Sequence, residues 1–333
     1  MKTIAPFSLL GYLQVINYKE AVLARAFVCP GQGAQSIGMG KALSDRYKEA
    51  KAVFQEIDDA LGMSLSLLIW DGDLETLTLT ENAQPALMAT SLAAFRALES
   101  EGIRLEADDF VAGHSLGEYS ALALSGALSI ADTARLLKAR GKAMQAAVPV
   151  GIGAMAAIIG LDFAAASEVA AEAADGEVCQ AANDNDPGQV VVSGNAAAIE
   201  RAVEIAKSKG AKRAIILPVS APFHCALMTP AAEEMKKALA EVSILRPKVP
   251  LVANVIAEAV SEPEAIRKLL VEQITKSVRW RESVLWIAKQ GVSEIWEIGA
   301  GKALTGMVRR INRDIKCRHV ALPEDISNLI ESL

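Results

Sequence analysis

The sequence predicts an α/β fold in which a smaller α+β lobe is inserted into a large lobe with a parallel sheet. The chain has 333 residues, of which 52% are hydrophobic, so it can bury a large core. Short apolar runs alternate with longer helix-like segments, as in strands connected by helices. The composition changes over residues 148–219, where strand, helix, strand, helix and strand patterns follow one another closely.

Charge and cysteine content exclude several classes of protein. The formal net charge is −6 and no block of like charge is present, which argues against nucleic acid, whose phosphates require a concentrated basic surface. No CxxC pair occurs, so neither a zinc knuckle nor a disulfide framework is indicated. We expect a monomeric protein of a reducing cytoplasm, with no metal or redox cofactor and no membrane partner. The cysteines are Cys29, Cys179, Cys225 and Cys317.

Residues 1–24 form an amino-terminal extension that has some features of a signal peptide. One lysine precedes an apolar segment, and Ala24 and Ala26 have the spacing of a cleavage site. However, Gln14 and Asn17 interrupt the apolar segment, and a cut after Ala26 would remove the start of the next strand. We assign no function to this extension. Three origins stay open for it: a native segment, a misassigned start and an expression remnant.

The first part of the large lobe, residues 25–147, is predicted to bring two strand ends to one edge of the sheet. "RAFVC" is an apolar run that ends in a Pro/Gly turn, and "DFVAGHS" is a second strand that ends at Ser115. Active residues collect at the carboxyl ends of parallel strands, so we expect Ser115 at the active edge. Helices are predicted over residues 41–61, 80–102 and 116–129, the second opened near Pro85 and closed by Gly102.

The small lobe, residues 148–219, has the element order of a ferredoxin-like α+β unit. The large lobe is expected to resume at residue 220 and to continue to residue 333, with further strands in "VPLVANV" and "SEIWEIG". The elements predicted for the small lobe are a strand at 153–162, a helix at 163–174, a strand pattern at 177–194, a helix at 196–210 and a strand at 211–220.

"GHSLG", centred on Ser115, matches the G-x-S-x-G pattern, in which a strand-to-helix turn exposes a serine hydroxyl. This pattern gives the large lobe its α/β-hydrolase-like assignment. The pattern is short, and a simple tight turn is the alternative. The strand before it and the helix after it favour a nucleophile, and the amide of Leu116 at the helix start is placed to donate to an oxyanion.

A nucleophilic serine needs a base, and the sequence contains three histidines. His114 is adjacent to the serine, so its side chain is expected to point away. His319 is explained more simply as a strand or surface histidine. His224 follows a Pro-containing turn at the end of an apolar run, which makes it the leading candidate for the base.

Arg140 interrupts the largely apolar face of a predicted helix. One explanation is an arginine that extends to solvent or pairs with an internal acid. The other is a guanidinium that binds a substrate carboxylate through two parallel hydrogen bonds, which beside a serine acyl-transfer centre implies a dicarboxylic acyl group. The residues on the same face are Thr133, Leu137, Met144 and Ala147, and those on the opposite face are Arg135, Lys138 and Lys142.

The glycine-rich loop "PGQGAQSIGMG" matches neither the P-loop nor the dinucleotide fingerprint. Such a loop can bring a backbone amide, for example that of Gln32, to a neighbouring strand end. We therefore expect Gln32 to supply a second oxyanion donor.

Ten segments, taken together, resemble the malonyl-CoA:acyl carrier protein transacylases of bacterial fatty-acid synthesis. They occur in that family's order and at its spacings, and they extend from about residue 25 to about residue 310. The segments are "FVCPGQGAQSIGMG", "QPALMATSLA", "GHSLGEYSAL", "ARGKAMQ", "GAMAAIIG", "PGQVVVSG", "APFHCALM", "VANV", "QITKSVRWRESV" and "EIGAGKALTGM".

The resemblance implies a role for each candidate residue. Ser115 would be the nucleophile and His224 its base, while Arg140 would bind the malonyl carboxylate. The backbone amides of Gln32 and Leu116 would form the oxyanion hole. The implied reaction is ping-pong transfer of malonate from malonyl-CoA to the phosphopantetheine thiol of acyl carrier protein, with no further cofactor.

The resemblance also places Gln273 where the family uses a main-chain group to orient the histidine, which implies a Ser-His dyad without an aspartate. Cys29, Cys225 and Ala300 depart from the family pattern without removing a group that the mechanism uses. Phe223 and Leu116 resemble the malonyl-selective pattern. Two alternatives stay open: a serine esterase or thioesterase of the α/β-hydrolase type, and an inactive scaffold that binds the carrier protein.

Overall fold

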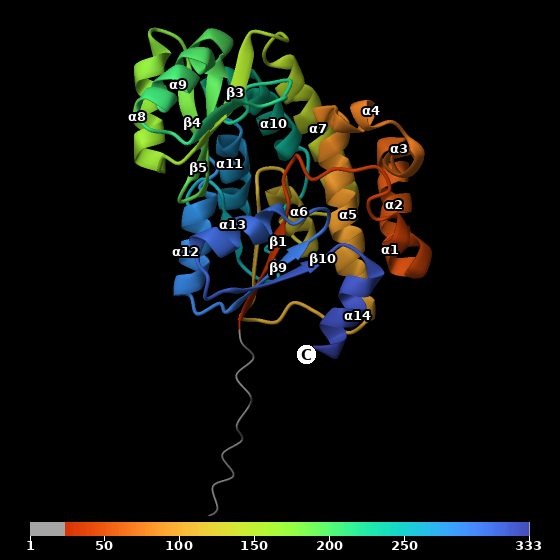
Figure 1. The fold of residues 1–333 in the computed structure, drawn as a ribbon. Coiled ribbons are helices and arrows are strands. Elements are labelled where there is room, and N and C mark those ends of the chain that lie inside the picture. Colours follow the sequence, from red (N-terminus) through yellow and green to blue (C-terminus); the bar gives the residue numbers. More distant parts are fainter. Residues whose placement is uncertain (1–23, 333) are drawn as a thin grey trace, which may run out of the picture.

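The computed structural model describes residues 24–332 (Figure 1). The predicted signal-peptide-like stretch lies outside the described residues, apart from Ala24. No helix in the described part of the chain is both long and apolar enough to cross a membrane.

A six-stranded sheet forms the centre of the large lobe, in the order β10-β9-β1-β2-β7-β8. All neighbouring pairs from β10 to β7 are parallel, which confirms the predicted parallel sheet. The pair β7·β8 is antiparallel and was not predicted. The strands are β1 (Arg25–Cys29), β2 (Phe110–Gly113), β7 (Leu251–Ala253), β8 (Glu258–Val260), β9 (Glu294–Ile298) and β10 (Lys316–Val320).

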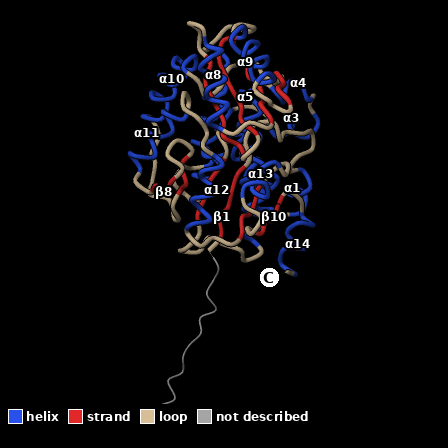
Figure 2. The backbone as a smooth tube through the Cα atoms, turned by 60° about the vertical axis from the view of Figure 1, so that its left-hand side comes forward, coloured by secondary structure: helices blue, strands red, loops and turns tan. Residues whose placement is uncertain are grey.

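Helices cover both faces of this sheet, so its central strands are apolar on both sides (Figure 2). In β1, Phe27 and Cys29 pack on one face, and Ala26 and Val28 on the other. The helices of the first face include α1 (Lys41–Arg46), α2 (Lys48–Leu61), α3 (Leu65–Asp71), α4 (Leu74–Thr78), α5 (Thr80–Ser100), α6 (Gly117–Leu124), α7 (Ile130–Ala146), α10 (Thr229–Ala240), α11 (Pro263–Gln273) and α14 (Pro323–Glu331); α12 (Trp280–Lys289) and α13 (Ala303–Ile311) cover the second.

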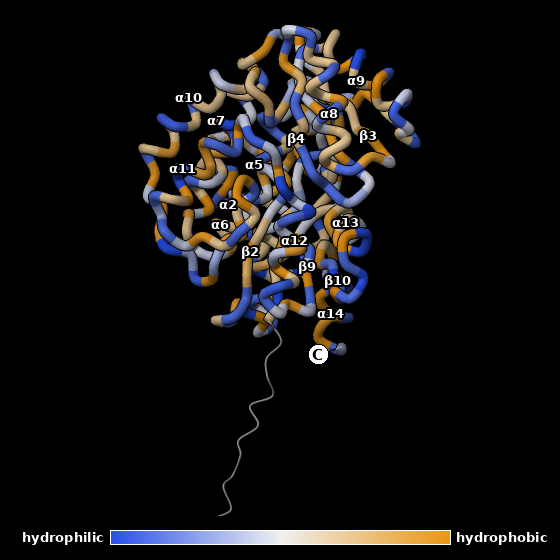
Figure 3. Tube along the Cα trace, turned by 90° about the vertical axis from the view of Figure 1, so that its left-hand side faces the viewer, coloured by the Kyte–Doolittle hydropathy of each residue, from blue (hydrophilic) through white to orange (hydrophobic). Residues whose placement is uncertain are grey.

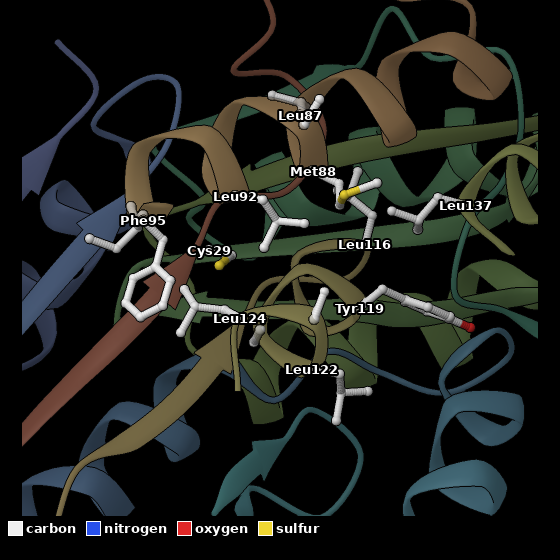
Figure 4. Packing of buried hydrophobic residues seen from close by; sticks show 14 of the residues in the cluster. Cys29, Leu87, Met88, Leu92, Phe95, Leu116, Tyr119, Leu122, Leu124 and Leu137 are labelled. Atoms are coloured by element: carbon white, nitrogen blue, oxygen red, sulfur yellow. The ribbon is translucent and has the colours of Figure 1, made fainter. Parts of the chain in front are cut away.

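Peripheral helices such as α10 and α11 alternate between hydrophilic and hydrophobic positions, as expected of helices with one buried face (Figure 3). The long helix α5 is instead buried along most of its length. Its side chains Leu87, Leu92 and Phe95 belong to the same cluster as Leu116, just before α6, and Leu124, at its end (Figure 4). This packing supports the turn that carries Ser115.

Two local predictions were wrong. The single helix expected over residues 41–61 is divided at Tyr47, whose backbone is extended (φ −117°, ψ 119°) and whose side chain is buried. Pro85 lies inside α5 rather than at its first turn, since the helix already begins at Thr80.

The small lobe contains β3 (Gly153–Ile159), α8 (Phe163–Ala174), β4 (Cys179–Asp186), β5 (Gln189–Asn195), α9 (Ala196–Ser208) and β6 (Arg213–Ile216). Its four strands form an antiparallel sheet in the order β4-β5-β3-β6, and α8 and α9 share a core with it. This βαββαβ order confirms the ferredoxin-like prediction. We retain as a proposal the lobe limits 148–219, with residues 25–147 and 220–333 in the large lobe.

Strand β4 attaches the small lobe to the large lobe through its polar residues. Asn183 forms a parallel bridge with Val278. The buried carboxylate of Asp184 pairs with Arg281 at 2.9 Å, and Asp186 pairs with Arg310 at 2.7 Å. Because these acids are buried and paired, the small lobe is docked by specific contacts rather than by a flexible connection.

Close packing between α5 and α7 holds Arg140 in place. A Cβ added at the neighbouring Gly141 would lie 2.4 Å from Glu81 Cα and 2.6 Å from Thr80 O, both backbone atoms of α5. No larger residue fits unless the helices separate.

We expect Gly141→Ala to lower the free energy of unfolding by about 1–3 kcal/mol, because overpacking outweighs the ~1 kcal/mol helix-propensity gain of alanine. Urea unfolding measures this difference. Lys142→Ala, at the exposed neighbouring position, is the control and should change stability by less than about 0.5 kcal/mol. A Gly141→Ala protein at least as stable as the parent would contradict the close-packing argument.

Candidate active site

Ser115 lies in the turn between β2 and α6, in left-handed backbone with φ +54°. The two glycines of "GHSLG" are sterically required here. A Cβ on Gly113 would lie 2.0 Å from the carbonyl of Gly117, and one on Gly117 would lie 2.2 Å from Cys29 O. The sequence therefore builds the strained strand-to-helix turn that projects a serine hydroxyl above the sheet.

His224 contacts this hydroxyl directly. Its Nε2 lies 2.8 Å from Ser115 Oγ, and its Nδ1 lies 2.8 Å from the backbone oxygen of Gln273. A carbonyl oxygen can only accept, so Nδ1 carries the proton and Nε2 is left free to accept from the serine. The predicted dyad geometry is present, with a main-chain oxygen in the place of an aspartate.

The imidazole of His224 is held in its neutral form. Burial lowers its pKa to about 3, and the positive charge of Arg140 acts in the same direction. A neutral imidazole at neutral pH is the form that can accept a proton.

Arg140 is 1% exposed and belongs to α7. Its Nη1 donates to Gln84 Oε1 at 2.8 Å, and its Nη2 donates to Gln273 Oε1 at 2.9 Å and to Ser115 Oγ at 3.1 Å. Among the described residues no carboxylate forms an ion pair with it, and its Nε has no hydrogen-bond partner. Burial lowers the pKa of the guanidinium. Arg140 therefore has no route to solvent and no ion pair with an acid of the described residues, although the buried Glu118 acts on its charge from beyond contact distance. These were the two explanations weighed against a carboxylate-binding role.

The backbone amides of Gln32 and Leu116 are available as donors. Across residues 24–332 neither amide donates to a protein acceptor, and Leu116 precedes the first residue of α6. The loop that contains Gln32 lies against the serine turn, since a Cβ on Gly31 would be 2.8 Å from His114 O. The Gln32 side chain donates to Thr80 Oγ1 at 3.2 Å, away from this role.

The other two histidines do not join the dyad. His114 Nε2 lies 2.9 Å from Asn185 Oδ1 on β4, so its side chain turns toward the small lobe, as expected. His319 lies in β10, with Nδ1 3.7 Å from Asp325. Within the described ranges no group of His, Cys, Asp or Glu has the arrangement of a metal site.

Sequence reasoning missed three residues that support the site. Asn254, after β7, accepts from Ser115 N at 2.9 Å and donates to Gly113 O at 2.7 Å. Glu118 is fully buried beneath the serine turn, and burial raises its pKa to about 7. Gln84 binds Arg140. All three lie inside the recognised segments "VANV", "GHSLGE" and "QPALM", and this membership was the available signal.

A serine hydroxyl, a neutral histidine and a buried cation converge in one centre, and this arrangement is typical of a serine acyl-transfer site. The acyl transferase domain model matches residues 26–321. The chain belongs to the acyl transferase domain family.

Similar proteins agree with this assignment and confirm the predicted resemblance. The chain is 48% identical to the malonyl CoA-acyl carrier protein transacylase of Bacillus subtilis (strain 168) over 309 residues, which cover 92% of this chain and 96% of that protein. It is similar to the crystal structure of the acyl-carrier-protein-S-malonyltransferase of Bartonella henselae, at 55% identity and a TM-score of 0.90, over 93% of this chain and 99% of that one. A malonyl-transacylase in complex with a type II PKS acyl-carrier protein matches at 41% identity and a TM-score of 0.90, over 93% and 100% of the two chains.

The low pKa of His224 predicts a pH-dependent stability. Between about pH 3 and its ordinary value of 6.5, the unfolded chain binds a proton that the folded chain does not. The free energy of unfolding should therefore fall as the pH drops through this range, by up to about 1.4 kcal/mol per pH unit from this group. Urea unfolding of the parent and of His224→Gln between pH 4 and pH 7 measures it, with a smaller slope expected for the variant. Parallel curves for the two proteins would contradict a neutral, buried His224.

Proposed function

We propose that this chain transfers the malonyl group of malonyl-CoA to the phosphopantetheine thiol of acyl carrier protein, which supplies fatty-acid elongation. The observation that carries the proposal is Arg140, a buried guanidinium without a carboxylate partner that donates to the hydroxyl of Ser115. A substrate carboxylate would satisfy this cation through paired, charge-assisted hydrogen bonds. The relatives' names, which specify malonyl transfer, agree with a dicarboxylic acyl group.

In the first half-reaction, His224 Nε2 takes the proton of Ser115, and Oγ attacks the thioester carbonyl. The amides of Gln32 and Leu116 donate to the tetrahedral oxyanion. When the intermediate collapses, the carbon–sulfur bond breaks and His224 returns the proton to the sulfur of coenzyme A. The product is a malonyl-serine ester whose free carboxylate is bound by Arg140.

In the second half-reaction, the carrier thiol gives its proton to His224 and attacks the ester carbonyl. The bond to Ser115 Oγ breaks, and the serine recovers its proton from His224. The histidine needs no change of tautomer between the two steps, because the backbone oxygen of Gln273 binds Nδ1–H throughout. The carrier protein leaves with malonate as a new thioester.

We expect brief incubation with malonyl-CoA to add one malonyl group to the protein, at Ser115, and expect holo carrier protein to remove it. Intact mass measurement followed by peptide mapping tests this cycle, and Ser115→Ala should remain unmodified. An adduct lost to water, with the carrier unloaded, would indicate a hydrolase. If the parent protein takes no adduct, the transfer proposal fails and the scaffold alternative is favoured.

Arg140→Ala should reduce kcat/KM for malonyl transfer by about 30-fold or more, equivalent to at least about 2 kcal/mol, because a buried charge pair is lost. Acetyl transfer, which offers no carboxylate, should fall less than about fivefold. Arg135→Ala, on the exposed side of the same helix, serves as the control and should change neither rate. Equal losses for the two acyl groups would show that Arg140 does not recognise the carboxylate.

A further inference from the structure

The carboxylate of Glu118 lies directly beneath the active site without reaching it. Glu118 is in the first turn of α6 and is 0% exposed. Its Oε2 accepts from the backbone N–H of Asn254 at 2.8 Å and from Gln273 Nε2 at 3.1 Å. No hydrogen bond joins Glu118 to Ser115 Oγ, His224 or Arg140 among the described residues. Its hydrogen bonds therefore reach the site through Asn254 and Gln273, while its charge acts on Arg140 without direct contact.

Asn254 carries the first connection, from Glu118 to the nucleophile. The Asn254 side chain accepts from Ser115 N at 2.9 Å and donates to Gly113 O at 2.7 Å. These two bonds bracket His114 and so hold the strained turn on the N-terminal side of Ser115. Because Glu118 binds the backbone N–H of the same asparagine, it fixes the segment from which that side chain extends.

Gln273 carries the second connection, from Glu118 to the base and to the cation. Its backbone oxygen binds His224 Nδ1, and its side-chain Oε1 accepts from Arg140 at 2.9 Å. Gln273 Nε2 donates to Glu118 Oε2 at 3.1 Å and also to Ser115 O at 3.0 Å and Asn254 Oδ1 at 3.3 Å, so the amide nitrogen faces this group of acceptors. The amide oxygen must then face Arg140, which is the orientation that a guanidinium needs.

We propose that Glu118 is a positioning residue for acyl transfer, which holds the serine turn, the histidine and the arginine in one geometry through Asn254 and Gln273. The proposal rests on the function proposed above. Misplacing reacting groups by about 1 Å can cost on the order of 100-fold in rate. Glu118 therefore contributes to the rate of Ser115 acylation without contact to the substrate.

The test compares Glu118→Ala with Glu118→Gln in single-turnover acylation by malonyl-CoA. The alanine variant loses both acceptor bonds, so its acylation rate constant should fall about 30- to 100-fold, while the amplitude stays near one malonyl group per chain. The glutamine variant keeps an oxygen that can accept from Asn254 and Gln273, so its rate should lie within about fivefold of the parent. A purely structural role would lower the amplitude instead, because fewer chains would be folded.

Asp109→Ala is a matched control. Asp109 is also a buried carboxylate that accepts backbone hydrogen bonds, from Arg25 N and Glu106 N, but it precedes β2 and lies at the opposite end of that strand from Ser115. This variant should lower the melting temperature and leave the acylation rate constant within about twofold of the parent. The positioning role would be overturned if the acylation rate constant of Glu118→Ala lay within threefold of the parent, or if only the amplitude fell.

A second measurement tests the positioning role of Glu118 independently of malonyl transfer. Phenylmethylsulfonyl fluoride modifies an activated serine without any malonyl group, so its reaction rate at Ser115 reports the geometry of the dyad alone. If the parent takes no malonyl adduct, the proposed function fails. The sulfonylation rates then still test whether Glu118 positions the dyad. A slower reaction in the alanine variant, restored in the glutamine variant, supports the positioning role, and equal rates in all three proteins overturn it.

Discussion

Burying the guanidinium of Arg140 without a carboxylate partner costs free energy, and much of the active site is arranged around that cost. Its neutral acceptors come from distant segments, Gln84 on α5 and Gln273 at the end of α11. The close approach of α5 and α7 at Gly141 brings the first acceptor within reach. The same charge helps to keep His224 neutral, so the proposed carboxylate-binding residue and the proposed base are coupled electrostatically.

The two lobes meet at this centre. The large sheet supplies the serine turn at the end of β2, and the small lobe binds the adjacent residue through Asn185 and His114. Buried acidic residues of β4 fix the contact between the lobes. The inserted lobe is therefore part of the framework that orients the serine turn, and its attachment bears on the geometry of the site as well as on stability.

The sequence allowed the three candidate residues that the structure brings together to be predicted, because each is chemically unusual in its setting. Ser115 stands between two glycines after a strand, His224 is one of three histidines, and Arg140 interrupts an apolar helix face. Local pattern did not identify Glu118 and Asn254 as supports, because their partners lie more than a hundred residues away and follow no local periodicity; only their place in the recognised segments pointed to them. The break at Tyr47 was missed for a related reason, since tertiary packing determined it against a continuous helical pattern.

The antiparallel strand β8 was also missed, because short strands at a sheet edge carry little pattern of their own. The oxyanion roles of Gln32 and Leu116 follow from the resemblance and from their unpaired amides, and they stand as proposals.

Both members of the dyad occupy left-handed backbone, Ser115 at φ +54° and His224 at φ +60°. For residues other than glycine this conformation costs about 1–3 kcal/mol at each position. Glycine would adopt it without strain, so Ser115→Gly would remove backbone strain together with the nucleophile. On the proposed roles, the two positions carry a stability–activity trade-off, because the substitution that relieves the backbone strain also removes the hydroxyl or the imidazole on which the proposed transfer depends.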